Sequence, residues 1–379
     1  MNSIISNQKK DNDSFSFTIS GINVSFINAI RRTVISDIPL AVFKTFPYDK
    51  SDCIIHKNTS RFNNEILKQR LSCIPIFIDI DETPIKNLIV KVRNINTTTE
   101  KQYITSEYFE IYDQSTKQLL PTPLRNTFFP PNNITKQYID FVRLLPGFIQ
   151  HSDTKSITGE EINLECKISV GMARDNSMFN SVSMAAFTNT SVAKEELDLH
   201  FQNYIKNFMK NENLSDAELE TAEKDWYALN AKRYFIKDSF DCNFTTACVY
   251  DCPTLIKKAC TILINKFKVF IDSSIHNPYN ISLQIEQNYT FANNCFDIIL
   301  HNESYTVGKI IEYILFTEFV EVQSPTMSFV SFLKEHPHYS SSLVRTVFID
   351  DITEENVVDI LKNKFQTIIN IFEHIREQL

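Results

Sequence analysis

Four cysteines that lie close together in the sequence are the first candidates for a chemical role. A cluster formed by Cys242, Cys248, Cys252 and Cys260 could bind zinc through its thiolates. Their spacings match no common zinc pattern, however, and the helical pattern of the last segment predicts Cys260 on an apolar helix face. We therefore favour a structural role for these cysteines and expect no metal.

Histidines and paired carboxylates are the other side chains that could transfer protons. His336 and His338 flank Pro337 and could act as ligands or as an acid and a base, but a turn that leads into a strand is the more common setting for this pattern. Paired acids occur in three places that look like turns or helix caps: Asp79 with Asp81, Glu160 with Glu161, and Asp350 with Asp351. We expect no catalytic residue and no cofactor.

The composition excludes several classes of function. Only 5 of the 379 residues are glycine, too scattered for a phosphate-binding loop or a dinucleotide fingerprint. The formal net charge of -8 argues against direct binding of nucleic acid. No charge-free apolar run approaches the roughly 18 residues of a membrane span, and residues 1–14 are polar, so we expect no secretion, no membrane contact and reduced cysteines.

The first elements that could position functional side chains are a strand, a turn and a helix. Apolar and polar residues alternate from Phe15 to Ile19, which predicts a half-buried strand. We expect Ser25 to cap the following helix, and Asp37 and Pro39 to end it. The apolar face of this helix carries Ile27, Ile30 and Val34.

The same order of elements returns near the other end of the sequence. Alternation from Phe296 to Leu300 predicts a strand, and Thr306 opens a helix. The apolar face of that helix carries Val307, Ile310, Ile311 and Ile314. Each copy also has a later amphipathic helix, at 251–270 and at 353–375. We interpret the copies as two related modules that bury their apolar helix faces against each other.

The predicted class is α+β, with two such modules packed as a pseudo-heterodimer within one chain. The first module comprises 1–48 and 168–271. Short apolar runs separated by turn residues and prolines indicate an inserted β-rich domain at 49–167. A linker is expected at 272–294, and the second module at 295–379.

Two smaller features belong to this outline. Residues 194–232 have a helical pattern, contain Trp226, and predict a hairpin of two helices with a capping box at Ser215–Glu218. Within the linker we expect one short strand at 281–285.

Several stretches of the first module and its insert carry the motifs of one known family. Asn28-Ala-Ile-Arg-Arg32 resembles the Asn-Ala/Ser-Leu-Arg-Arg run of the α-type assembly subunits of DNA-dependent RNA polymerases, in particular the third-largest subunit of eukaryotic-type enzymes. Asn64-Glu-Ile-Leu-Lys-Gln-Arg-Leu-Ser-Cys-Ile-Pro-Ile76 is similar to the family's acidic-x-Ile-x-His-Arg-Leu-Gly-Leu-Ile-Pro segment. Residues 171–187 resemble the return from the inserted domain, and 235–270 the closing strand and helix.

The last hundred residues resemble the smaller partner of that subunit, the eleventh. Glu303-Ser-Tyr-Thr-Val-Gly-Lys309 is similar to a Glu-Asp-His-Thr-Leu-Gly-Asn turn, and Glu335-His-Pro337 with Val344-Arg-Thr-Val347 to two further motifs. The fusion of the two subunits in one chain resembles the arrangement in large nucleocytoplasmic DNA viruses. The composition, rich in Asn, Ile, Lys and Phe, is similar to that expected from an AT-rich genome of this kind. For a viral source, the resemblance implies that the protein is located in the viral factory of the host cytoplasm and in the virion. For a cellular source, it implies a location in the nucleus.

Some positions depart from the family pattern. Gln69 and Tyr305 stand where the family has His, Ser72 where it has Gly, and Lys309 where it has Asn. The eukaryotic subunit carries a cysteine-rich zinc loop in its insert, whereas this segment has no C-x2-C spacing. We expect no zinc there.

The resemblance implies a set of contact residues. On the first helix, an Arg pair would normally face solvent, but the motif implies contact with the second-largest subunit. The residues expected to contact large subunits are Asn28, Arg31, Arg32, Glu65, Arg70, Leu71 and Pro75, with a local surface ion pair as the alternative for Glu65 and Arg70. The residues expected at the internal dimerisation interface are Ile27, Ile30, Val34, Val307, Ile310, Ile311 and Ile314.

The predicted function is a non-catalytic assembly subunit of a multisubunit DNA-directed RNA polymerase that nucleates assembly of the two largest subunits. The expected partners are those two and other polymerase subunits, without direct nucleic acid, membrane or homo-oligomer contacts. One alternative is a stand-alone scaffold that uses the same fold in another complex. The other is an enzyme with an unrecognised acid–base site.

Overall fold

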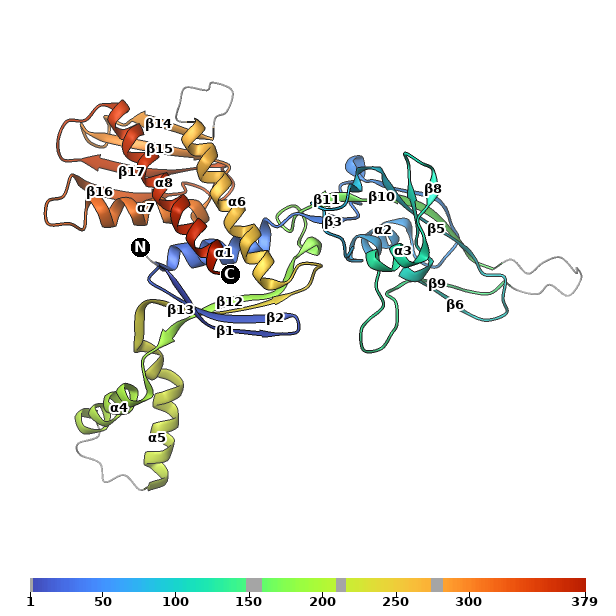
Figure 1. The fold of residues 1–379 in the computed structure, drawn as a ribbon, viewed down its shortest axis with the longest axis horizontal. Coiled ribbons are helices and arrows are strands. Elements are labelled where there is room, and N and C mark those ends of the chain that lie inside the picture. The colour runs from blue at the N-terminus through green and yellow to red at the C-terminus, as the bar shows by residue number, and fades with distance from the viewer. Residues whose placement is uncertain (1–2, 148–158, 209–215, 274–281) are drawn as a thin grey trace, which may run out of the picture. The chain divides into compact units, whose positions relative to one another are not determined.

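The computed structural model describes residues 3–147, 159–208, 216–273 and 282–379 (Figure 1). They form two compact units of helices and antiparallel strands, which confirms the predicted α+β class. Unit 1 consists of Met1–Val34, Met184–Thr245 and Cys252–Leu379, and unit 2 of Ile35–Ser183 and Thr246–Asp251. In the part of the chain that the structure covers, no helix is long and apolar enough to cross a membrane.

The first sheet of unit 1 has four strands in the order β1-β2-β13-β12. The predicted alternating strand is confirmed as β2, in which Phe15, Phe17 and Ile19 are buried. Strand β1 shows no alternation of apolar and polar residues, because nearly all its side chains are exposed. It forms by backbone pairing with β2. The bounds are β1 Ile4–Asp11, β2 Ser14–Ser20, β12 Val182–Ser191 and β13 Phe235–Thr246.

The first helix, α1 (Val24–Ser36), starts earlier than predicted. The helix begins at Val24, before the expected cap Ser25, and the side chain of Asn23 accepts the backbone N–H of Ser25 at 3.0 Å. An Asn at this position satisfies a donor that the first turn leaves unpaired. The predicted apolar face is buried.

The second sheet of unit 1 has the order β14-β15-β17-β16. Its strands are β14 Leu283–Gln287, β15 Cys295–His301, β16 Met327–Leu333 and β17 Ser341–Phe348. The predicted strand 296–300 is confirmed within β15. Helix α7 (Tyr305–Phe319) begins one residue before the expected Thr306, and Thr353 caps α8 (Glu354–Gln378) by accepting the N–H of Asn356.

Helices α6 (Cys252–Ser273) and α8 pack side by side in unit 1 (Figure 1). Ring centroids of Phe267 and Phe365 are 5.7 Å apart, and those of Phe270 and Phe365 are 5.8 Å apart. Phe26 of α1 lies 5.5 Å from Phe372 of α8 and 6.3 Å from Tyr313 of α7. Helices that accompany the two sheets therefore share aromatic contacts.

The predicted helical hairpin lies between β12 and β13 and consists of α4 (Lys194–Phe208) and α5 (Asp216–Leu229). Trp226 is 2% exposed and packs against Phe201 and Tyr234 at 5.4 and 5.9 Å between ring centroids. The expected capping residue Ser215 lies outside the described residues, as does part of the expected linker, 274–281. The linker strand is found as β14, two residues later than expected.

Unit 2 is built around a five-stranded sheet with the order β4-β10-β5-β7-β8, accompanied by two small pairs, β11-β3 and β6-β9. The strands are β3 Leu40–Val42, β4 Cys53–Asn58, β5 Leu88–Ile95, β6 Gln102–Thr105, β7 Glu110–Asp113, β8 Gln118–Leu119, β9 Asp140–Leu144, β10 Glu161–Lys167 and β11 Ser169–Gly171. Helices α2 (Asn64–Ser72) and α3 (Thr122–Phe128) complete it. Leu67 of α2, Val90 of β5 and Phe109 belong to one apolar core.

Candidate subunit-contact site

The cysteines singled out from the sequence are separate thiols. Burial raises the pKa of Cys242 to about 12, and burial likewise raises the pKa of Cys260 to about 12. Cys252 donates a long hydrogen bond to the carbonyl of Phe244, which ties α6 to the end of β13. Across the described ranges, no three His, Cys, Asp or Glu side chains gather as a metal site would require.

The predicted acid–base candidates are exposed or engaged in turns. His336 accepts the backbone N–H of His338 on Nδ1 at 3.2 Å, as in a local turn. The carboxylate of Asp79 accepts the N–H of Asp81 and the hydroxyl of Tyr250, both at 2.9 Å. Burial and the hydrogen bond to Asp79 raise the pKa of Tyr250. These contacts stabilise loops.

The predicted contact residues on α1 form a compact polar group. Arg31 donates from Nε and Nη2 to the side-chain oxygen of Asn28 at 3.1 and 2.9 Å. Because this oxygen holds the guanidinium from within the same helix, the Arg31 side chain is pre-organised and half exposed. The neighbouring Arg32 is exposed.

The predicted contact residues after α1 belong to unit 2, on α2 and the segment after it. Glu65 and Pro75 are exposed, whereas Leu71 is fully buried in the core. Leu71 therefore stabilises the helix and offers no surface to a partner. Arg70 forms no ion pair with Glu65 but donates to the backbone carbonyls of Phe141 and Asp140, at 2.7 and 3.0 Å.

All seven residues predicted for the internal interface are buried in the structure. Among the helix pairs of the described residues, the most extensive contact is that of α6 with α8, both of which belong to unit 1. Phe267, Phe270, Phe365 and Phe372 were missing from the predicted interface set. Their helical spacing on two amphipathic helices was the available signal.

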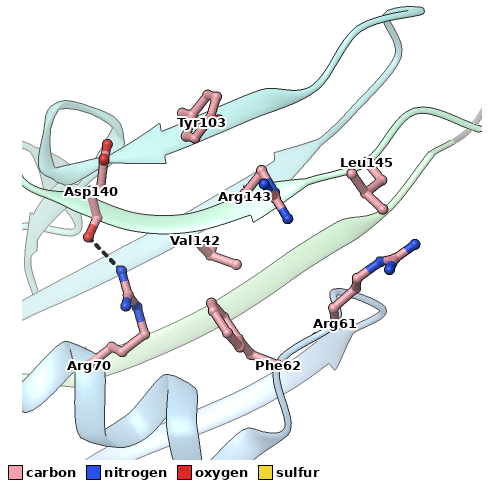
Figure 2. Close-up of a pocket in the computed structure, with 8 residues that line it drawn as sticks. All are labelled: Arg61, Phe62, Arg70, Tyr103, Asp140, Val142, Arg143 and Leu145. Carbon is pink, nitrogen blue, oxygen red and sulfur yellow. Dashed lines mark hydrogen bonds between the residues drawn. The ribbon is translucent and has the colours of Figure 1, made fainter.

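A second group that the sequence reasoning did not single out lies in unit 2. Arg61 and Arg143 are far apart in the sequence but line one pocket with Arg70, Phe62 and Tyr103 (Figure 2). No motif connects these residues: the pairing of β6 with β9 places Tyr103 opposite Arg143, and Arg70 of α2 is hydrogen-bonded to the backbone of β9.

Curated proteins of one class, the α-like subunits of DNA-directed RNA polymerases, match the sequence at modest identity. No family model matches the chain.

Two of these relatives show the extent of the similarity. The chain is 36% identical over 73 residues to the DNA-directed RNA polymerase subunit Rpo3 of Pyrococcus furiosus, which covers 19% of this chain and 25% of that subunit. It is 25% identical over 198 residues to the DNA-directed RNA polymerases I and III subunit RPAC1 of Mus musculus, which covers 47% of this chain and 51% of the mouse protein. The chain thus spans between a quarter and about half of the curated relatives that it matches.

Proposed function

We propose that this chain is a non-catalytic assembly subunit of a multisubunit DNA-directed RNA polymerase and that it nucleates assembly of the two largest subunits. The observation that carries the proposal is the similarity to polymerase subunits from both an archaeon and a mammal. Phosphodiester chemistry would then belong to another subunit, and this chain would supply a platform.

The platform would be a pseudo-heterodimer of two modules, 1–48 with 168–271 and 295–379, joined through 272–294, with 49–167 as the inserted domain. The aromatic contacts between α6 and α8 support this proposal, as do the buried apolar faces of α1 and α7. An internal salt bridge adds to them, since Lys266 of α6 lies 3.0 Å from Glu303, just before α7. Fusion of two obligate partners raises their effective concentration to about the millimolar range.

Two polar surfaces are the proposed contacts with the second-largest and largest subunits. One is Asn28, Arg31 and Arg32 on α1, and the other is Glu65 on α2 with Pro75 after it. The pre-organised guanidinium of Arg31 supports the first, because a planar group held in place loses little entropy when it binds a carboxylate or carbonyl.

A tagged pull-down of the full chain from the cells that naturally express it tests the proposal. We expect both large polymerase subunits in stoichiometric amounts at high salt. Arg31→Glu should reduce their recovery, whereas the exposed substitution Arg93→Glu, on β5, should not. Recovery of the chain with unrelated partners would favour a scaffold of another complex and would contradict the polymerase role.

The internal interface has its own test. Val34→Asp and Ile311→Asp each place a charge at a position that is at most 1% exposed, so each should disrupt the platform. Wild-type solubility together with wild-type polymerase recovery for both variants would refute the proposed interface.

The viral fusion and the location of the protein are part of the same proposal. For a large DNA virus, the chain would act in the viral factory of the host cytoplasm and enter the virion, and for a cellular source it would act in the nucleus. Mass spectrometry of purified virions and imaging of the tagged chain separate these cases.

A further inference from the structure

The pocket of unit 2 shown in Figure 2 has a cavity volume of about 320 Å³. Arg61 and Phe62 come from the segment before α2, Tyr103 from β6, and Val142 and Arg143 from β9. Three different parts of the sequence therefore form one small pocket. Its volume is at the lower end of the range for ligand-binding sites.

The charge in this pocket is predominantly positive. Arg61 and Arg143 are exposed, and neither forms a salt bridge within the residues that the structure describes. The one carboxylate at the rim, Asp140, points away from the three guanidinium groups in Figure 2, while its backbone carbonyl accepts from Arg70. In a chain of net charge -8, this is a local concentration of cations that an anionic group could neutralise.

The third arginine makes the pocket rigid. Arg70 is fixed by its bonds to the carbonyls of Phe141 and Asp140, and its guanidinium carbon lies 5.3 Å from the centre of the Phe62 ring. The ring of Phe62 is thereby held beside the cavity by a cation–π contact. The wall is already in place before a ligand arrives, which reduces the entropy lost on binding.

Apolar surface accompanies the charge. Tyr103 is 54% exposed and Phe62 is 37% exposed, although both line the cavity, and Val142 provides a buried floor. Partly exposed aromatic rings beside arginines are the composition that protein interfaces favour.

We propose that this pocket is a docking site for an acidic polypeptide segment that carries carboxylates on either side of an apolar or aromatic residue. Arg61 and Arg143 would bind the carboxylates, and Phe62, Tyr103 and Val142 would contact the central side chain. Charge complementarity selects this occupant, because guanidinium groups bind carboxylates in a planar, bidentate manner.

Nucleic acid is a weaker fit to the same surface. Affinity for a phosphate backbone needs many cations along a groove. Here three arginines lie around one small cavity on an acidic chain. The proposal concerns unit 2 alone and does not depend on the polymerase role.

Fluorescence anisotropy with the full chain tests the proposal. The probe is a labelled peptide, Glu-Asp-Phe-Asp-Glu, and the comparison ligands are its amide analogue, Gln-Asn-Phe-Asn-Gln, and a twelve-nucleotide oligothymidylate. We expect saturable binding of the acidic peptide only, weakening as ionic strength rises, because exposed ion pairs are screened by salt.

Variants locate the binding site on the chain. Arg61→Gln and Arg143→Gln should each weaken peptide binding about threefold to fivefold, and the double variant about tenfold or more. Tyr103→Ala should weaken it as well, without changing the salt dependence. Arg93→Gln, an exposed arginine of β5 outside the pocket, is the matched control and should bind as the wild type does. Thermal melting verifies that each variant is folded.

Three results would overturn the proposal. The first is absence of acidic-peptide binding, and the second is binding that Arg61→Gln and Arg143→Gln leave unchanged. The third is tighter binding of the oligothymidylate than of the peptide, which would make the pocket a nucleic-acid site.

Discussion

The guanidinium of Arg70 on α2 donates its Nε hydrogen to the backbone carbonyl of Phe141 on β9 at 2.7 Å. A second bond, from Nη2 to the carbonyl of Asp140 at 3.0 Å, makes the side chain a fork across two consecutive carbonyls. These two residues lie where the β6–β9 register shifts. Carbonyls at an irregular strand position lack regular ladder partners, so Arg70 satisfies them.

We predict that Arg70→Gln destabilises unit 2 by about 1 to 3 kcal/mol, since hydrogen bonds from a charged donor are stronger than neutral ones and this side chain is half-buried. Chemical denaturation of the full chain measures the loss. Arg93→Gln, on an exposed position, is the control and should remain within about 0.5 kcal/mol of the wild type. Equal stability of the two variants would mean that the fork contributes nothing.

The aromatic pair Phe267 and Phe365 is predicted to dominate the contact between α6 and α8. Both side chains are fully buried, so truncation of either to Ala should cost about 3 to 5 kcal/mol. The rings are 5.7 Å apart at an interplanar angle of 49°, so a double-mutant cycle should give a coupling of about 0.5 to 1.5 kcal/mol. Phe316→Ala on α7, where the ring is 41% exposed, should cost far less. Additive effects in the cycle would show that the rings do not interact.

Much of unit 1 could be predicted because its apolar residues repeat with the period of the element that they form. The alternation of apolar and polar residues predicts the strands β2 and β15 and their buried faces. The apolar stripes likewise predict the helices α1, α7 and α8 and the faces that they bury. β1 escaped prediction, because a strand whose side chains are nearly all exposed has no such alternation. Start positions of α1 and α7 differed by a residue or so, since neighbouring polar residues such as Asn23 and Ser25 can both serve as caps.

The contact residues were harder to predict, since a motif names residues without stating what they already bind. The sequence could suggest that Arg70 faces a partner, but only the structure shows that two carbonyls of the same unit hold it. The pocket around Arg61 and Arg143 combines residues from three separate parts of the sequence, and Tyr103 meets Arg143 only through the pairing of β6 with β9. Local sequence patterns do not encode such contacts.

The ion pair between Asp297 of β15 and Arg345 of β17 predicts a loss of stability in acid. Burial acts to raise the pKa of Asp297, but hydrogen bonds from Arg345 and Asn288 and the charge of Arg345 outweigh it, so this pKa lies below its usual range. Arg345 binds both carboxylate oxygens at 2.7 Å. A carboxyl with a lowered folded-state pKa stabilises the fold above its unfolded pKa of about 3.9, and this contribution is lost as the pH falls through the folded value.

Unfolding free energies of wild type and Asp297→Asn between pH 7 and pH 2.5 check this expectation. The advantage of the wild type should be complete near neutral pH and should shrink below about pH 4. Asp359→Asn removes a surface pair with Lys362 at 3.7 Å and should show little difference at any pH. A constant difference for Asp297→Asn across the whole range would contradict the pKa argument.

Thiol reactivity should separate the exposed cysteine from the buried ones. Cys73 is exposed, whereas Cys242 and Cys260 are buried and have pKa values raised to about 12. At pH 8 a thiol with such a pKa is a thiolate in only about one molecule in ten thousand, so it reacts slowly even when reagent reaches it. We expect one fast phase with a disulfide reagent, absent in Cys73→Ser and retained in Cys248→Ser. A fast phase that survives in Cys73→Ser would identify another reactive thiol.

Gly308 on α7 is predicted to tolerate no larger residue, because the helix approaches β16 closely there. A Cβ at this position would lie 2.0 Å from Cε2 of the Phe332 ring. In an open helix, Gly→Ala would stabilise by about 1 kcal/mol, but overpacking of a buried site typically costs about 1 to 3 kcal/mol. We expect Gly308→Ala to be destabilising overall, as measured by chemical denaturation.

A second substitution tests whether the loss of stability in Gly308→Ala comes from the Phe332 ring. Phe332→Ala removes the Cγ, Cδ2 and Cε2 atoms that the new Cβ would meet, so the double variant should lose less stability than the sum of the two single variants. If the two effects add, or if Gly308→Ala alone is stabilising, the close approach of α7 to β16 does not limit this position.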